Sequence, residues 1–281
     1  YRTVGDEHRE AISLLNLSAV AEQRGEIGEA VDRAAAAREI AERIGSDMYE
    51  GFALSHLGSA AHLAGDLDRA ERFLTAALDL FDALDADARC AMTTAILTEV
   101  AIDRGDLTEA ERRAERTASL LDGHAGRKRL AELARIRGRL ALARGDPGAA
   151  ATALKSAVES ARDGGFTQVE AQALASLGAA AAERGDAEEA ADRLTAALDL
   201  GRRIEDARTV AAAADLLADL LAGSAAGSDS FDRETLIEAL RRSPPEAVPA
   251  ESAAVPAAYR EIADRWRVDG DGVTAAYPSI G

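Results

Sequence analysis

The sequence predicts an all-α solenoid of stacked helical hairpins, and three observations support this prediction. Glycine-acid pairs recur every 40 residues, at Gly25-Glu26, Gly65-Asp66, Gly105-Asp106, Gly145-Asp146 and Gly185-Asp186. A fixed period of this length is typical of stacked-repeat proteins. Apolar residues make up 47% of the chain and aromatic residues only 4%, a composition that suits closely packed helices better than a sheet. Finally, the apolar residues around each glycine follow helical spacing.

Each repeat is predicted to contain one helix before the glycine and one after it. Counted from the glycine, offsets −8, −4, +5, +9, +12 and +16 are mostly apolar, which is the i, i+3, i+4 spacing of one buried helix face. Offset +5 is alanine in all five repeats, at Ala30, Ala70, Ala110, Ala150 and Ala190. Offset −7 is always a small residue, at Ser18, Gly58, Thr98, Gly138 and Gly178. We therefore expect the helices to touch at these small residues.

A second set of breaks separates each hairpin from the next. These breaks fall at Gly45-Ser46-Asp47, Asp85-Ala86-Asp87, Gly123 to Gly126, Gly164-Gly165 and Glu205-Asp206. The aspartates after the turn glycines are predicted N-caps, because their carboxylates accept backbone N–H bonds and suit the helix dipole. These are Asp66, Asp106, Asp146 and Asp186. A sixth first helix is expected over Ala207–Ala222, so residues 1–222 form the repeat array.

The character of the chain changes after Ala222. Residues 223–242 are predicted to be a Gly/Ser/Ala linker followed by a short amphipathic helix from Phe231 to Arg242, which would cap the open end of the stack. The remaining residues, 243–281, begin with a proline-rich segment. A last short helix is expected over Ala257–Val268, followed by a tail from Asp269 onwards.

Composition and charge exclude several functions. The net charge of −17 disfavours direct binding to nucleic acid or to anionic membranes, since both need a basic surface. The single cysteine, Cys90, rules out a disulfide framework within the chain, and no apolar run is long enough to span a bilayer. We expect a cytoplasmic protein without a cofactor. Because the chain opens with Tyr1, it is also expected to be a fragment of something longer.

No catalytic or metal-binding constellation is visible. His56 and His62 are six residues apart and lie on different helix faces, so they do not form a metal pair. The Arg-Gly-Asp triplets at Arg104, Arg144 and Arg184 each fall on a repeat turn, and a turn requirement explains them better than adhesion does. The sequence therefore predicts a protein that is not an enzyme.

The repeating residues resemble a known family. The second repeat shows the pattern Leu57-Gly58, Ala61, Gly65-Asp66, Ala70, Leu74 and Ala77-Leu78, which resembles the tetratricopeptide repeat over about residues 6–222. The resemblance implies a right-handed α-α superhelix. The repeats here have 40 residues rather than the usual 34 or so, so both helices must be longer. These long repeats are also similar to the sensor regions of bacterial ATP-dependent regulators of the maltose-activator type, and to the C-terminal repeats of some actinobacterial antibiotic regulators.

The resemblance places the first helix of each repeat along a concave groove and implies binding residues there. The groove candidates are Gln23, Ser55, Ser59, His62, Glu99, Asp103, Arg135, Arg139 and Gln172, with Glu22 beside Gln23. Arg135 and Arg139 are four residues apart and share a helix face, where they could clamp a partner carboxylate. Alternatively, they pair with Glu99 and Asp103 of the preceding repeat and hold the stack. The Lys/Asn clamp of chaperone-binding family members is not visible at these positions.

These observations predict an interaction scaffold that binds a peptide or protein segment in its groove. The alternative is the effector-sensing or autoregulatory region of a larger bacterial transcriptional regulator, whose partners would include other domains of the same chain. The oligomeric state stays open, since an Ala- and Leu-rich open end could stack on another copy.

Overall fold

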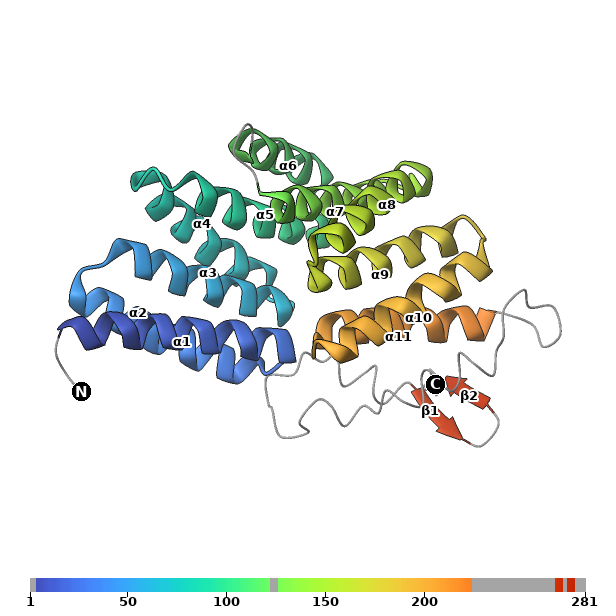
Figure 1. Cartoon of the computed structure of the whole chain (residues 1–281), viewed down its shortest axis with the longest axis horizontal. Coiled ribbons are helices and arrows are strands. Elements are labelled where there is room, and N and C mark those ends of the chain that lie inside the picture. Colours follow the sequence, from blue (N-terminus) through green and yellow to red (C-terminus); the bar gives the residue numbers. More distant parts are fainter. Residues whose placement is uncertain (1–3, 122–125, 224–265, 270–271, 276–281) are drawn as a thin grey trace, which may run out of the picture. The chain divides into compact units, whose positions relative to one another are not determined.

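A computed structural model describes residues 4–121, 126–223, 266–269 and 272–275 (Figure 1). Within these residues the chain forms eleven helices and one short two-stranded ribbon. The helices fall into two compact units, the first reaching Arg129 and the second beginning at Leu130. The all-α repeat fold predicted from the sequence is thus confirmed.

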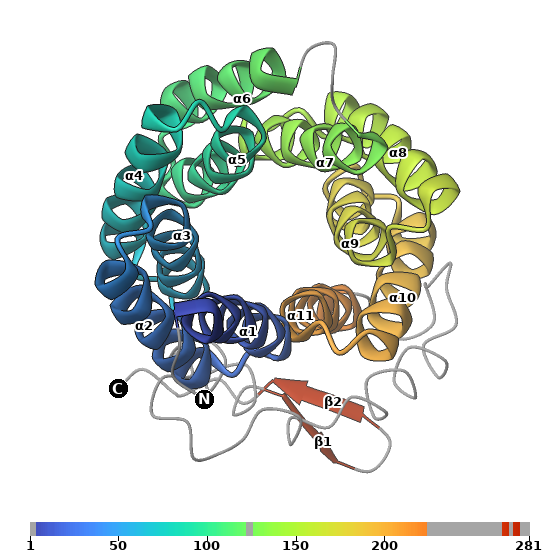
Figure 2. The same cartoon turned by 60° about the vertical axis from the view of Figure 1, so that its left-hand side comes forward.

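The first unit consists of three successive antiparallel hairpins. Its helices are α1 (Val4–Arg24), α2 (Ile27–Ile44), α3 (Asp47–Leu63), α4 (Leu67–Ala83), α5 (Asp87–Arg104) and α6 (Leu107–Leu121). Each odd-numbered helix packs against the even-numbered helix that follows it, and α2 and α4 also pack against the next hairpin. Figure 2 shows α1, α3 and α5 side by side on the inner side of this unit's curve, with α2, α4 and α6 outside.

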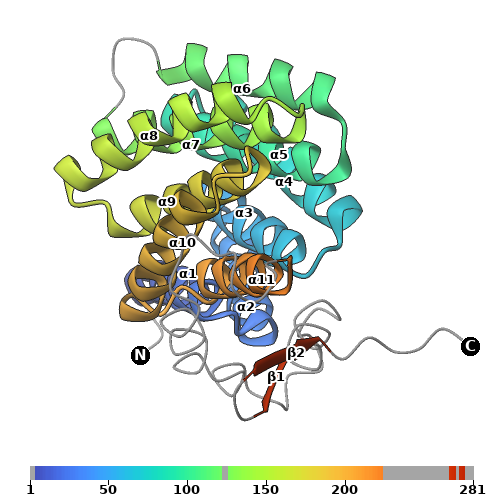
Figure 3. The same ribbon diagram turned by 90° about the vertical axis from the view of Figure 1, so that its right-hand side faces the viewer.

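The second unit repeats this arrangement. Its helices and strands are α7 (Arg127–Ala143), α8 (Pro147–Gly164), α9 (Thr167–Glu183), α10 (Ala187–Arg203), α11 (Ala207–Gly223), β1 (Trp266–Asp269) and β2 (Gly272–Ala275). Helix α10 packs against both α9 and α11 (Figure 3), and α8 packs against α9. Helix α11 is a first helix without a second one in the described residues, as the sequence predicted for 207–222.

The structure corrects the prediction for the end of the chain. Residues 266–268 lie in strand β1 rather than in a helix, and β1 pairs antiparallel with β2, from Trp266 opposite Ala275 to Asp269 opposite Gly272. The reason is local: Trp, Val and Thr favour strands, and a Gly-Asp pair between two such runs is a hairpin signal in the sequence. The prediction of a tail from Asp269 onwards is also wrong where the structure describes it, because Gly272–Ala275 form β2. Apart from Gly223, which ends α11, the predicted linker, capping helix and proline-rich segment lie outside the described residues, as does the first part of the last predicted helix.

The turns explain the 40-residue period. The five turn glycines have φ angles between 73° and 82°, in the left-handed region that glycine adopts without steric cost. The aspartate that follows then caps the next helix: Asp66 accepts from the Arg69 N–H at 3.0 Å and Asp146 from the Ala149 N–H at 2.8 Å. Asp106 and Asp186 cap in the same way, so the predicted N-caps are confirmed. The first repeat differs, because the side chain of Glu26 makes no cap bond.

This geometry accounts for the three Arg-Gly-Asp triplets. In each, the arginine stands at the end of a helix, the glycine supplies the positive φ and the aspartate caps the next helix. Left-handed residues also mark the breaks between hairpins, at Gly45, Asp85, Gly165 and Glu205. The predicted break at Gly123 lies outside the described residues.

Side-chain size is matched between two positions of the repeat, offset −7 in the first helix and offset +9 in the second. Offset −7 in the first helix lies against offset +9 in the second at Gly58–Leu74, Gly138–Leu154 and Gly178–Leu194. The residues at these offsets in the other two repeats are Ser18 and Ala34, and Thr98 and Ala114. Wherever +9 is leucine, −7 is glycine. A Cβ atom on Gly58 would lie 2.5 Å from the Cγ of Leu74, far inside contact distance. Where +9 is alanine, −7 carries a hydroxyl; that of Ser18 donates to the carbonyl of Ala30 at 2.9 Å.

Candidate binding surface on the odd-numbered helices

Polar side chains in the first unit link each odd-numbered helix to the next. His56 Nδ1 on α3 lies 2.6 Å from Glu22 Oε1 on α1, and His62 Nε2 lies 2.7 Å from Asp103 Oδ2 on α5. Ser55 Oγ on α3 also lies 3.3 Å from Thr93 Oγ1 on α5. These are hydrogen bonds between neighbouring repeats on the inner layer of helices.

These residues combine fixed positions with solvent access. The His62 side chain is only 5% exposed, whereas that of its partner Asp103 is 32% exposed. Glu99 on the same helix is buried, and Ser59 and Gln23 are half-buried. A histidine held by a carboxylate has a restricted ring orientation, and the exposed edge of that carboxylate can accept further N–H bonds. The layer thus offers preorganised acceptors and donors to a backbone or polar side chain.

In the second unit, the candidates lie on α7 and α9. Arg135 is buried and Arg139 is half-buried, one helical turn apart on α7. Gln172 Nε2 on α9 donates to Asp206 Oδ2 at 3.2 Å. Asp206 is itself buried and accepts from the Thr209 hydroxyl at 2.9 Å at the start of α11. Within the second unit, Gln172 and Asp206 thus connect α9 to the start of α11.

The structure brings some predicted site residues together and leaves other predictions open. His62 and Asp103 form a pair, while Ser55 and Gln172 bond residues that the sequence did not point to. Glu99 and Asp103 belong to the first compact unit and Arg135 and Arg139 to the second, so their pairing stays a prediction.

Three contributors were missed by sequence reasoning. His56, Thr93 and Asp206 were not among the predicted site residues, although each bonds one odd-numbered helix to another. Asp206 carried a signal, because an acidic residue at a helix start is a cap. Thr93 carried none, since its bond to Ser55 spans 38 residues.

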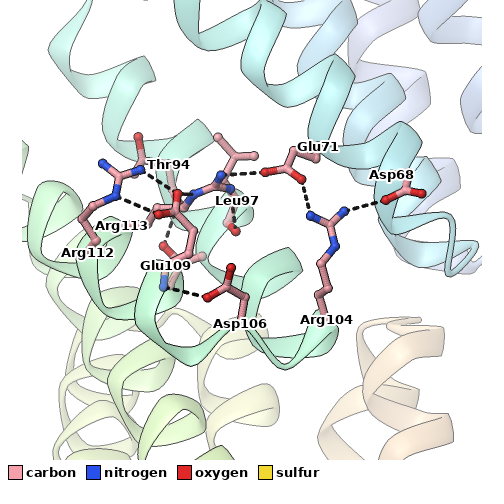
Figure 4. Close-up of polar contacts among 10 residues, drawn as sticks. Asp68, Glu71, Thr94, Leu97, Arg104, Asp106, Glu109, Arg112 and Arg113 are labelled. Atoms are coloured by element: carbon pink, nitrogen blue, oxygen red, sulfur yellow. Dashed lines mark hydrogen bonds and ion pairs between the residues drawn. The ribbon is translucent and has the colours of Figure 1, made fainter.

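A separate ion-pair network joins α4, α5 and α6 (Figure 4). Glu71 on α4 accepts from Arg104 at the end of α5 and, at 2.7 Å, from Arg113 on α6. Arg113 also donates to Glu109 within α6, and to the Leu97 carbonyl at 3.2 Å on α5. The bond from Arg104 lowers the pKa of Glu71 against the opposing effect of burial. This network ties two repeats together, which is a structural role.

The same network lowers the pKa of Glu109 to about 2. The cause is the hydrogen bond from Arg112, reinforced by Arg113 and opposed in part by burial. Arg112 Nε donates to Glu109 at 2.8 Å. Glu109 is therefore a carboxylate at all ordinary pH values, and it is paired with Arg112 and Arg113.

The thiol is unsuited to nucleophilic chemistry. Cys90 is buried and donates to Asp82 Oδ1 at 3.2 Å. Burial raises the pKa of this thiol to about 12, and the neighbouring Asp82 carboxylate adds to the effect, so the reactive thiolate is scarce at neutral pH. Among the residues that the structure describes, no three His, Cys, Asp or Glu side chains are grouped as metal ligands. No helix in the described part of the chain combines the length and apolar character needed to cross a membrane.

The fold and the repeat pattern resemble those of tetratricopeptide repeat proteins, and the comparisons agree. Residues 9–83 match the family model described as tetratricopeptide repeat. A Rap protein complexed with Competence and Sporulation Factor is similar over 91% of this chain and 74% of that chain, with a TM-score of 0.64 and 14% identity. A comparison with curated protein sequences found no match.

Two further solved structures share the fold. One is a signal transduction ATPase with numerous domains that carries a tetratricopeptide repeat sensor, from Pyrococcus horikoshii. It has a TM-score of 0.57 and 13% identity, and the match covers 92% of this chain but only 39% of that chain. The other is the APC/C hetero-tetramer Cut9-Hcn1, with a TM-score of 0.53, 17% identity and coverage of 92% and 46%. The resemblance to tetratricopeptide repeats is thus confirmed at the level of the fold.

Proposed function

We propose that the protein is a non-enzymatic interaction module that binds a peptide or protein segment on its odd-numbered helices. The observation that carries the proposal is that recurring and varying positions of the repeat have different roles. The positions that recur, such as Ala30 and Leu74, are fully buried in packing. The polar positions on the inner layer vary from repeat to repeat, and some of them, such as Asp103 and Arg139, remain partly exposed. Variable side chains on a constant scaffold suit the recognition of a specific partner.

The chemistry of the layer suits an extended segment with polar and acidic side chains. The carboxylate of Asp103, oriented by His62, can accept backbone N–H groups of such a segment. In the second unit, taken by itself, the half-buried Arg139 carries a guanidinium, a group that suits acidic side chains. A structural relative was solved as a complex with a separate factor, which supports a binding role for this architecture. The free, buried Cys90 is compatible with a reducing cytoplasm.

Arg139→Glu tests this proposal, with Arg137→Glu as a matched control. Arg137 is exposed on the same helix but points to a different face, because two residues advance a helix by about 200°. A peptide selected on the whole chain from a random display library would be titrated calorimetrically into both variants. We expect Arg139→Glu to weaken binding at least about tenfold, or 1.4 kcal/mol, and Arg137→Glu to leave it nearly unchanged.

The thermal midpoint of each variant is the companion measurement. A loss of affinity in Arg139→Glu with an unchanged midpoint supports a binding role. Equal affinities in the two arginine variants would mean that Arg139 does not belong to the binding surface. A library that yields no binder at all would count against the proposed interaction module.

A second candidate function is the sensor region of a larger regulator. The similarity to the tetratricopeptide repeat sensor of a signal transduction ATPase favours it, although the 13% identity supports the fold alone. In this function the inner layer would bind an effector or another domain of the same chain. Sequencing the gene on both sides of the segment that encodes these residues tests it. The sensor function requires a nucleotide-binding domain in the same reading frame.

A further inference from the structure

Two offsets of the repeat carry aromatic and apolar side chains around an arginine in the first unit. Offset −16 is Tyr49 on α3 and Arg89 on α5, and offset −13 is Phe52 and Met92 on the same two helices. The two offsets are three residues apart, so they lie on one helix face. These four residues are called the Phe52 patch below. Arg89 is exposed and the other three are half-buried.

Arg89 is held in a defined position within the Phe52 patch. Its Cζ atom lies 4.6 Å from the centroid of the Phe52 ring, and one of its guanidinium nitrogens donates to the Met92 sulfur at 3.5 Å. Stacking on an aromatic ring restricts the guanidinium plane and leaves the N–H groups at its edge available for a carboxylate. Among the described residues, no carboxylate forms an ion pair with Arg89.

The aromatic rings connect the patch to the core of the first unit. The Phe52 ring packs on that of Phe81, with centroids 5.5 Å apart, and Phe81 is 1% exposed. The Tyr49 ring lies 6.5 Å from that of Phe52. One side of the patch is therefore anchored in the core, which keeps its residues in place. Aromatic, methionine and arginine side chains in partly exposed, well-anchored positions are those that binding interfaces favour.

Offset −13 has the character of a recognition position rather than a packing position. The packing offset +5 is fully buried alanine in all five repeats. Offset −13 instead changes from repeat to repeat and is half-buried at Phe52, Met92, Glu132 and Gln172. It is apolar on α3 and α5 of the first unit and polar on α7 and α9 of the second. Each unit, taken by itself, therefore offers a different chemistry at this offset, and that of the first unit is apolar.

We propose that the Phe52 patch binds a stretch of the partner segment in which an Asp or Glu lies within two residues of a Leu, Met or Phe. This inference rests on the proposed function, since it names the partner chemistry for one part of the same inner layer. The apolar side chain contacts Phe52 and Met92, because a ring and a flexible thioether accommodate different apolar groups. The carboxylate binds the guanidinium of Arg89 through charge-assisted hydrogen bonds.

The short spacing follows from the geometry of the patch. Arg89 lies directly over the Phe52 ring, so the acidic and the apolar side chain bind side by side. An extended segment advances about 3.3 Å per residue, which places residues one or two apart within reach of both contacts. Helix α3 carries no Lys or Arg, so Arg89 supplies the positive charge that selects an acidic partner.

Display selection tests the charge preference. A random peptide library, fused at its C terminus so that every selected carboxylate is a side chain, would be panned on the whole wild-type chain and on Arg89→Glu. We expect wild-type binders to be enriched in the acidic–apolar stretch, and Arg89→Glu binders to carry Lys or Arg in place of the acid, since opposite charges attract. Arg72→Glu, at an exposed arginine of α4 outside the patch, should select the wild-type pattern.

Methyl NMR locates the selected peptide on the chain. The chain contains only two methionines, Met48 and Met92, and Met48 packs against the core of the first unit. In a chain labelled with ¹³C-methyl methionine, the peptide should shift the Met92 signal and leave that of Met48 nearly unchanged. Met92→Leu assigns the two signals. We also expect Arg89→Glu to weaken this peptide at least about tenfold in calorimetric titration, with an unchanged thermal midpoint.

The outcomes separate this inference from the proposed function. A library without any binder counts against the proposed interaction module. Binders that carry the same acidic–apolar stretch on wild type and on Arg89→Glu, or wild-type binders enriched in Lys and Arg, overturn the role of the Phe52 patch and leave the interaction module standing. A bound peptide that does not shift the Met92 signal does the same, and the stack of Arg89 on Phe52 would then only hold α3 against α5.

Discussion

At the scale of single residues, the most consequential feature is the match between offsets −7 and +9. A leucine at offset +9 occupies the space that a side chain at offset −7 would need, so only glycine fits at offset −7 without a clash. The demand is steric rather than conformational, because Gly58, Gly138 and Gly178 lie within helices and not at positive φ. A glycine within a helix costs up to about 1 kcal/mol of helix stability, and the close packing that it permits offsets this cost.

We predict that Gly58→Ala destabilises the protein by about 1–3 kcal/mol through overpacking against Leu74. Gly58→Ser with Leu74→Ala should cost less than the sum of the single changes, because it recreates the Ser18–Ala34 pair of the first repeat. Urea unfolding of the two single variants and the double variant measures this coupling. Gly28→Ala is the control: a Cβ there meets nothing within 4 Å, so that change should be neutral or stabilising. Additive effects at 58 and 74 would contradict the steric explanation.

The lowered pKa of Glu109 gives a second residue-scale prediction. A carboxyl group whose folded pKa is about 2, below an unfolded value near 4.5, contributes stability above pH 4.5. That contribution is lost as the pH falls from 4.5 through 2. Glu109→Gln should therefore be less stable than wild type at pH 7, by up to about 1 kcal/mol for a partly exposed ion pair. The difference should shrink toward pH 2.

Chemical unfolding at pH 7, 4 and 2.5 tests this pH dependence. Glu115→Gln, an exposed position on the same helix, provides the comparison and should show a smaller effect at pH 7. A constant difference between Glu109→Gln and wild type across the range would mean that the ion pairs of Glu109 do not contribute to stability.

At the scale of elements, helix boundaries follow from the turn residues. A left-handed glycine ends the first helix and an aspartate side chain begins the second, so a few residues specify each hairpin. This is why the helix boundaries were predictable to within a few residues in all five repeats. The β-ribbon was not predicted, because strands of four residues are too short to show a clear alternation of apolar and polar side chains.

Removing a cap should cost more in the second repeat than in the first. Asp66→Ala removes the bond to the Arg69 N–H and should destabilise the protein by about 1 kcal/mol. Glu26→Ala should have little effect, since Glu26 makes no side-chain cap bond. Thermal melts of both variants measure the difference, and Asp66→Asn should retain most of the stability because asparagine also caps helices. Equal losses in Asp66→Ala and Glu26→Ala would contradict the capping role.

At the scale of the whole molecule, the repeats separate architecture from recognition. Positions that recur build the contacts between helices, so they are readable from the sequence by their spacing alone. The inner-layer polar residues do not recur, and their partners are on other helices. The pair of His62 and Asp103 illustrates this, since both were expected in the groove but their hydrogen bond spans 41 residues.

The sequence by itself determined the helices, their turns and caps, and the order of the hairpins. The physical reason is that these depend on contacts between residues close in the chain and on a pattern that repeats. Only the tertiary structure showed which polar side chains bond across repeats and why Gly58 must be glycine opposite Leu74. These features depend on residues far apart in sequence, where side-chain size, burial and charge are matched in space rather than along the chain.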